Sequence, residues 1–104
     1  MHRRRLIANA AIMHLWQKFR ITYRPIVAIV ADMAADGVSF AEALEAWAEG
    51  EAIESVYGCW PASRWRSEIC YRILKSDGEA PGSLEAWFEA RVEEVRAIAD
   101  GVRS

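Results

Sequence analysis

The positions of helix start and stop signals most constrain how this chain can fold. Proline fits the first turn of a helix, a serine side chain can cap a helix start, and glycine favours a helix end. The start signals are Pro25, Ser39, Pro61 and Ser83, and the stop signals are Gly37, Gly50 and Gly78. Alanine is abundant and β-branched residues occur only in short runs, which favours helix over strand. We therefore predict an all-α, compact bundle of about five helices with a helix-turn-helix-like middle, at residues 6–19, 25–36, 40–49, 61–76 and 84–100.

The second and third of these helices differ in how clearly they are signalled. Apolar residues recur every three to four positions in the second, but its run 26–30 could also be a buried strand, because short β-branched runs fit both. Ser39 and Glu42 match the S-x-x-E capping box that opens the third helix. Gly50 is expected to end that helix, and a short helical piece at 51–57 follows.

The chain is long enough for one domain with a real core. It has 104 residues, near the commonest domain size, and 53% of them are apolar. We expect a single helical domain at 1–104. The helix at 6–19 is apolar nearly all round in its first half, which predicts a central position. Seven side chains are expected to be mostly buried: Trp16, Ile29, Leu44, Trp47, Ile69, Phe88 and Val95.

Charges are sorted along the chain. Residues 1–24 carry six bases and no acid, and residues 25–58 carry seven acids and no Lys or Arg. Residues 59–76 are again basic and residues 77–104 acidic, so a formal net charge of −2 conceals strong local fields. Two interpretations stay open: basic and acidic helices pair with each other inside the fold, or a charged face binds a macromolecule.

No arrangement typical of an enzyme is present. His2 lies near the terminus, and His14 lies in an apolar helix, where a hydrogen-bonded structural role is more common than catalysis. The sequence holds no metal-ligand, phosphate-loop or nucleophile motif, so we predict no catalytic, cofactor-binding or metal-binding residue. Cys59 and Cys70 have neither redox-pair nor zinc spacing. They are read as reduced, mostly buried thiols of a cytoplasmic protein.

The first residues are basic and then apolar, as in a secretory signal, but Asn9 interrupts the apolar run and no clear cleavage site follows. No apolar stretch approaches the roughly 18 residues of a membrane span. We therefore expect no leader and no membrane contact.

One helix, at 61–76, interleaves bases with aromatic rings. The candidate partner-binding residues are Arg64, Trp65, Arg66, Tyr71, Arg72 and Lys75. Such a set suits an acidic protein surface or a phosphate backbone. We expect Arg66 or Arg72 to anchor the partner, because a guanidinium matches a carboxylate. The alternative is a core face that contains Trp65, with a solvated basic back.

Arg91 falls in the middle of the apolar stripe of the last helix. A lone buried charge is costly, so Arg91 should either pair with an acid of the 32–54 segment or face a partner. We favour the internal pair.

The order of several short motifs resembles the small terminase subunits of tailed phages. These motifs are Tyr23-x-Pro25, Gly37-x-Ser39, Ser55-Val56-Tyr57-x-x-Trp60 and the ending WFEARVEEVRAIAD at 87–100. The resemblance covers about residues 23–100. It implies a helix-turn-helix that contacts DNA, a following helical part that forms rings, and a role in handing viral DNA to the large packaging subunit.

The chain departs from that pattern where DNA would be read. One extra residue precedes Trp60, and the would-be recognition segment carries Glu51 and Glu54 but no base, so it would repel phosphates. We therefore predict a small non-enzymatic binding protein, a phage or mobile-element accessory factor of inhibitor or adaptor type, with an acidic protein partner. A DNA-binding protein of small-terminase type is the alternative, and a homo-oligomer fits either.

Overall fold

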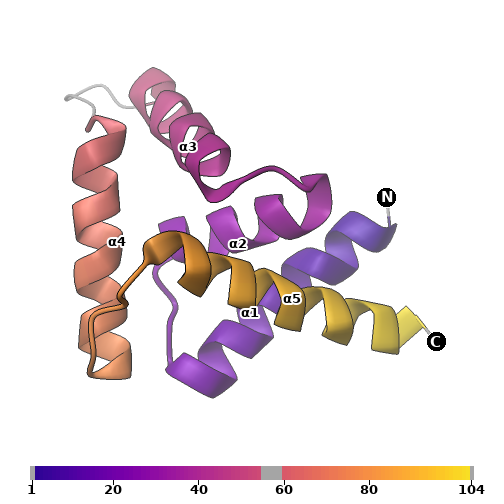
Figure 1. The fold of residues 1–104 in the computed structure, drawn as a ribbon. Coiled ribbons are helices and arrows are strands. Elements are labelled where there is room, and N and C mark those ends of the chain that lie inside the picture. Colours follow the sequence, from indigo (N-terminus) through magenta and orange to yellow (C-terminus); the bar gives the residue numbers. More distant parts are fainter. Residues whose placement is uncertain (1, 55–59, 104) are drawn as a thin grey trace.

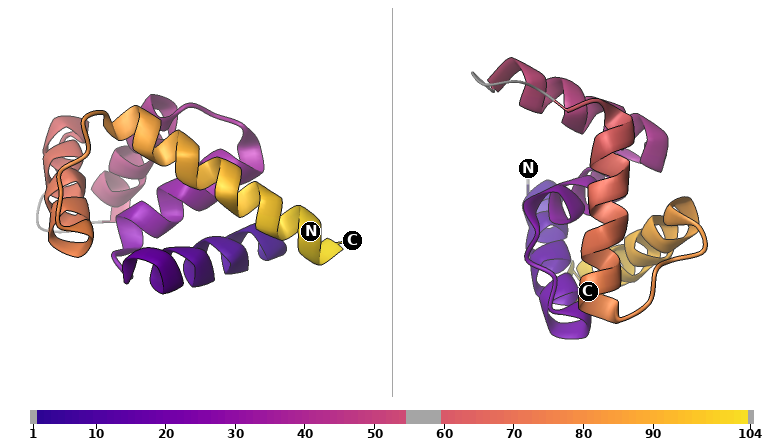
Figure 2. Two further views of the ribbon diagram at one scale, coloured as in Figure 1. Left: turned by 60° about the horizontal axis from the view of Figure 1, so that its bottom comes forward. Right: turned by 90° about the vertical axis from the view of Figure 1, so that its left-hand side faces the viewer.

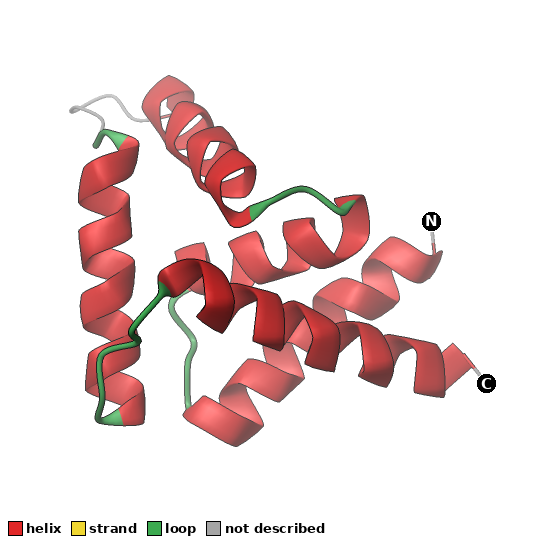
Figure 3. Cartoon of the chain, viewed as in Figure 1, coloured by secondary structure: helices red, strands yellow, loops and turns green. Residues whose placement is uncertain are grey.

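The computed structural model of this chain describes residues 2–54 and 60–103. These residues form helices and connecting loops, with no strand among them (Figure 3). The helices are α1 (His2–Phe19), α2 (Arg24–Asp36), α3 (Phe40–Glu54), α4 (Ala62–Asp77) and α5 (Leu84–Arg103), as labelled in Figure 1. The predicted all-α bundle is confirmed, and the ambiguous run 26–30 is helical.

Several helix ends lie away from their predicted positions. Helix α1 begins at His2, four residues earlier than expected, and α5 continues to Arg103. The prediction that Gly50 ends α3 is wrong, because the helix runs through it to Glu54. A glycine ends a helix when its backbone turns left-handed, and Gly50 does not. Part of the expected 51–57 piece therefore belongs to α3, and the remainder lies outside the described residues.

The other stop signals act as predicted. Gly37 and Gly78 adopt φ angles of 72° and 82° and close α2 and α4. The end of α1 lacks a glycine, and Arg20 takes the left-handed conformation there with φ of 57°. The amide of Ile21 then donates to the Leu15 carbonyl at 3.1 Å, as in a Schellman motif. This turn directs the chain from α1 into α2.

Helices α1, α2 and α5 pack against one another, α3 packs on α2, and α4 packs on α3. Figures 1 and 2 show α4 standing beside the rest of the bundle, with its C-terminal end close to the loop between α1 and α2. The start of α1 and the end of α5 lie together, where Arg3 donates to Asp100 at 2.8 Å. The closeness of α4 to loop 20–23 brings together two segments that are far apart in sequence.

The predicted core is largely confirmed. Five of the seven expected side chains are buried: Ile29, Leu44, Ile69, Phe88 and Val95. Phe88 stacks on Phe40 with ring centroids 4.5 Å apart. Trp47 is half-buried against this core. The prediction for Trp16 is wrong, because its side chain is 45% exposed.

The exposure of Trp16 corrects the expected central position of α1. Helix α1 contacts α2 and α5 through a narrow stripe that includes Ile7, Ala11 and Leu15. No described element covers the opposite side. A helix that is apolar nearly all round does not reveal which of its faces is covered, so the sequence alone could not place Trp16.

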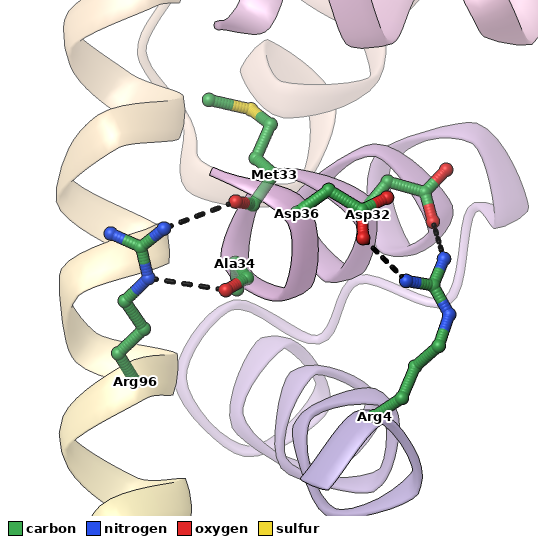
Figure 4. Close-up of polar contacts among 6 residues, drawn as sticks. All are labelled: Arg4, Asp32, Met33, Ala34, Asp36 and Arg96. Carbon is green, nitrogen blue, oxygen red and sulfur yellow. Dashed lines mark hydrogen bonds and ion pairs between the residues drawn. The ribbon is translucent and has the colours of Figure 1, made fainter. Parts of the chain in front are cut away.

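Much of the sorted charge is paired inside the fold. Arg4 bridges Asp32 and Asp36 of α2 at 3.1 and 2.7 Å (Figure 4). Burial and the neighbouring Asp36 raise the pKa of the Asp32 carboxyl, and Arg4 offsets this only in part. Figure 4 also shows Arg96 of α5 donating to two carbonyls at the end of α2. At the start of α1, Arg4 is thus paired with α2 and Arg3 with Asp100 of α5.

Candidate functional site

The six predicted binding residues of α4 do not share one face. Trp65 lies beside the buried Ile69 and Ile73, and its half-buried ring packs edge-on against Trp47 at 5.7 Å. This part of α4 is a core face, as the alternative interpretation held. Trp65 therefore supports the fold, and its ring is not freely presented to a partner.

Arg66 and Arg72, the predicted anchors, have partners inside the chain. Arg66 donates twice to the Glu85 carboxylate, at 2.7 and 3.1 Å. These hydrogen bonds lower the pKa of Glu85 to about 2. Arg72 donates to Glu68 at 3.2 Å. Both guanidinium groups are therefore engaged by acids within the fold, so neither is a free anchor for an acidic partner.

The remaining three residues define the outer face of α4: Arg64, Tyr71 and Lys75. All three are exposed. Tyr71 and Lys75 lie two and three helical turns after Arg64, on the side of α4 opposite the buried Ile69 and Ile73. The Arg64 guanidinium stacks over the Trp60 ring at 4.1 Å. Within the described residues neither Arg64 nor Lys75 forms an ion pair, so this face keeps its positive charge after folding.

A hollow of about 270 Å³ extends this positive charge to the end of α4. It is lined by Arg20, Ile21, Thr22, Tyr23, Arg72, Lys75 and Ser76, and we call it the basic hollow. The Arg72 guanidinium lies over the Tyr23 ring at 4.4 Å. Of its three cations, only Arg72 is paired with an acid in the described part of the chain.

Hydroxyl groups complete the basic hollow. Burial raises the pKa of the Tyr23 phenol, the Glu68 charge raises it further, and Arg72 opposes both. Tyr23 therefore keeps its proton at neutral pH and remains able to donate a hydrogen bond. Cations together with hydroxyl donors suit a carboxylate or another oxyanion.

A second hollow, of about 370 Å³, adjoins the first and is almost wholly apolar. It is lined by Ile12, Met13, Trp16, Ile21, Thr22 and Val27, and we call it the apolar hollow. Ile12 and Met13 are each about half exposed. Because Ile21 and Thr22 line both hollows, the basic and apolar surfaces are continuous. The guanidinium of Arg20, 5.0 Å from the Trp16 ring, lies at their border.

The third charged surface is the outer side of α3. Glu45, Glu49 and Ile53 follow one another at four-residue spacing, and all three are exposed. The side chain of Ile53 is 86% exposed, more than that of any other large exposed apolar residue described. No base lies on α3, so this helix presents an acidic stripe that ends in an apolar side chain.

His14 and Arg91 meet at one carboxylate, that of Glu94. His14 Nε2 lies 2.7 Å from Glu94 Oε1, Lys18 Nζ donates to Oε2 at 2.6 Å, and Arg91 Nε lies 2.7 Å from Oε1. The expected structural role of His14 fits this contact. The prediction that Arg91 pairs with an acid of the 32–54 segment is wrong, because its partner within the chain is Glu94. Both pair members lie on α5, one turn apart, and the Arg91 guanidinium stacks on Phe19 of α1 at 4.8 Å.

Cys70 is a free thiol and is half-buried, less than expected, whereas Cys59 lies outside the described residues. A further hollow, of about 550 Å³, is open and is bordered by Glu42, Glu89 and Glu93. In the described ranges no group of His, Cys, Asp or Glu is suited to hold a metal ion.

Sequence reasoning missed most of the basic hollow. Arg20, Thr22, Tyr23 and Ser76 were not among the candidate residues. The unusual concentration of bases before residue 25 was the available signal for Arg20. No local pattern shows that this loop meets the end of α4.

Comparisons of the chain with models of protein families, with curated proteins and with solved structures found no match. Among the described helices, none is both long and apolar enough to cross a membrane.

Proposed function

We propose that this chain is a small non-enzymatic binding protein, a phage or mobile-element accessory factor that acts as an inhibitor or adaptor on an acidic protein surface. The outer face of α4 carries this proposal. Arg64 and Lys75 are exposed there, and neither is neutralised by an acid within the described residues. The phage or mobile-element setting rests on the motif resemblance to small terminase subunits.

The geometry of this face favours a protein partner. Stacking on Trp60 holds the Arg64 guanidinium in place, so less conformational entropy is lost when a carboxylate binds. The half-exposed Tyr71 ring, between Arg64 and Lys75, offers apolar area and a hydroxyl group. Arg and Tyr are the residues that most often dominate protein–protein binding energy.

The DNA-binding alternative has less support. In a helix-turn-helix protein the second helix enters the DNA groove. Here α3 follows α2 after a short turn, but it carries acids and no base, with Glu45 and Glu49 exposed. The motif at 55–57 that entered the resemblance lies outside the described residues.

Affinity capture with charge-reversal variants tests the proposal. The bait is the whole chain, as wild type, as Arg64→Glu and as Arg5→Glu, and the source is a bacterial host lysate. Arg5 is the matched control, because it too is an exposed arginine without an ion pair in the described ranges. We expect a partner with an acidic surface that is retained by wild type and Arg5→Glu and lost with Arg64→Glu.

Equal capture of the same proteins by wild type and Arg64→Glu would contradict the proposal. A gel shift with duplex DNA, repeated across salt concentrations, tests the alternative. Steeply salt-dependent DNA binding that Arg64→Glu removes would favour the DNA-binding function instead.

A further inference from the structure

We propose that the chain associates with itself head to tail: Ile53 of one copy enters the apolar hollow of the next copy, and Glu49 meets Arg20. This goes beyond the proposed function, because it requires neither Arg64 nor an outside partner. The proposed association uses two surfaces of the same molecule: the apolar hollow with its basic border, and the acidic stripe of α3.

The apolar hollow is built to receive a side chain. Ile12, Met13 and Trp16 leave their side chains about half exposed on one side of α1, although each is large and apolar. Ile21 and Val27 complete the wall from the loop and from α2. Large apolar side chains that gather on one exposed side, rather than being scattered singly, are a feature of contact sites. A concave shape suits a projecting side chain better than it suits the flat surface of a lipid bilayer.

The α3 stripe has the complementary shape and charge. Ile53 projects from an exposed position. Glu49 lies one helical turn before it on the same side, where the Cβ atoms of residues four apart are about 6 Å from each other. In the receiving copy the apolar hollow lies beside Arg20, and the adjoining basic hollow also contains Lys75. An apolar side chain next to an acid therefore meets an apolar hollow next to a base.

The two surfaces do not meet within one molecule, because no residue of α3 lines the apolar hollow. Helix α3 and the C-terminal half of α1 lie at opposite ends of the protein in Figure 1 and in the right-hand view of Figure 2. The contact must therefore join different copies. Because it uses two different surfaces, each copy keeps one of each free, and association does not have to stop at a dimer.

Charge argues against a symmetric contact of hollow with hollow. Such a contact would bring Arg20 of both copies together without an acid among the residues that line either hollow. The described residues also offer no exposed strand edge, so an extended segment could not be held there by sheet hydrogen bonds. A helix such as α3 is the better occupant.

Complementary single variants test this geometry by sedimentation velocity over a wide range of protein concentration. Met13→Glu places a charge in the apolar hollow, and Ile53→Glu removes the projecting side chain. Both residues are at least half exposed, so the fold should persist, and far-UV circular dichroism checks this. Ala97→Glu is the matched control, since it adds the same charge at an exposed position of α5.

We expect wild type and Ala97→Glu to associate increasingly with concentration. Each of Met13→Glu and Ile53→Glu should weaken association at least tenfold, since burying an apolar side chain of this size commonly supplies that much. An equimolar mixture of the two variants should form a heterodimer and nothing larger, because each supplies one intact surface. Added salt should weaken the association of wild type, and the Arg20→Glu variant should associate more weakly than wild type.

A wild-type chain that stays monomeric at every concentration overturns the inference. So does a mixture of Met13→Glu and Ile53→Glu that remains monomeric, or association that neither variant changes. Binding to anionic lipid vesicles that Met13→Glu removes, with no self-association, would assign the apolar hollow to a membrane surface and also overturn it. The proposed function fails separately, through Arg64→Glu in the capture experiment.

Discussion

The imidazole Nε2 of His14 lies 2.7 Å from Oε1 of Glu94, and this contact joins the middle of α1 to α5. Lys18 and Arg91 approach the same carboxylate. Burial by itself raises the pKa of Glu94, but the hydrogen bonds from Lys18 and His14 and the charge of Arg91 outweigh it and hold the pKa at about 2. One ionised acid thus organises three basic side chains at the α1–α5 contact.

Replacing Glu94 by glutamine should destabilise the fold by about 1–3 kcal/mol, because the part-buried Arg91 and His14 would lose their acid partner. Urea denaturation followed by circular dichroism measures this loss. Glu93→Gln is the control, since the Glu93 side chain is 79% exposed. Equal stability of the two variants would mean that the cluster contributes nothing to the fold.

The depressed pKa of Glu94 predicts a loss of stability in acid. The carboxyl titrates near 4.5 when unfolded and near 2 when folded. Between these values the unfolded state binds more protons, so the stabilisation is complete above about pH 4.5 and disappears as the pH falls toward 2. With solvent screening it should amount to about 1–2 kcal/mol.

Urea titrations at several acid pH values, on wild type and Glu94→Gln, isolate this contribution. Glu85, held by Arg66 with a pKa of about 2, adds to the acid loss in the same range, and Asp32, whose pKa is raised, opposes it. The difference between the two proteins removes these shared effects. A difference that does not change with pH would show that Glu94 titrates normally.

Leu44→Ala tests how firmly α3 is attached. Leu44 is 5% exposed and belongs to the main core, so the substitution should cost about 2–5 kcal/mol. Leu74→Ala provides a comparison. Leu74 of α4 is 40% exposed, so its substitution should lower the free energy of unfolding much less. A loss below about 0.5 kcal/mol for Leu44→Ala would mean that α3 lies loosely on the bundle.

Local signals predicted the helices well because those signals act locally. Gly37 and Gly78 take the left-handed turn that the stop signals implied, and the Ser39 hydroxyl accepts a hydrogen bond from the Glu42 amide at 3.2 Å. Gly50 misled the prediction, because an isolated glycine lowers helix stability without forcing the chain to turn. Composition could not tell these glycines apart.

The candidate site was predictable only in part, since it depends on tertiary packing. The basic-aromatic character of α4 was visible in the sequence, but the pairing of Arg66 with Glu85 is made across two helices. Arg20 and Lys75 come together only because the loop after α1 passes the end of α4. The exposed Trp16 likewise reflects which face of α1 its neighbours leave open.

Gly50 and Gly78 differ in backbone conformation, so replacing each by alanine should change stability in opposite directions. Gly50 lies inside α3 with ordinary helical geometry, and a Cβ added there would contact nothing within 4 Å. Gly50→Ala should therefore stabilise the protein by about 0.5–1 kcal/mol. Gly78 is equally open but has φ of 82°, so Gly78→Ala should destabilise it by about 1–2 kcal/mol through backbone strain alone. Thermal denaturation of the two variants beside wild type checks both signs. A destabilised Gly50→Ala protein would show that α3 does not continue as a regular helix through this position.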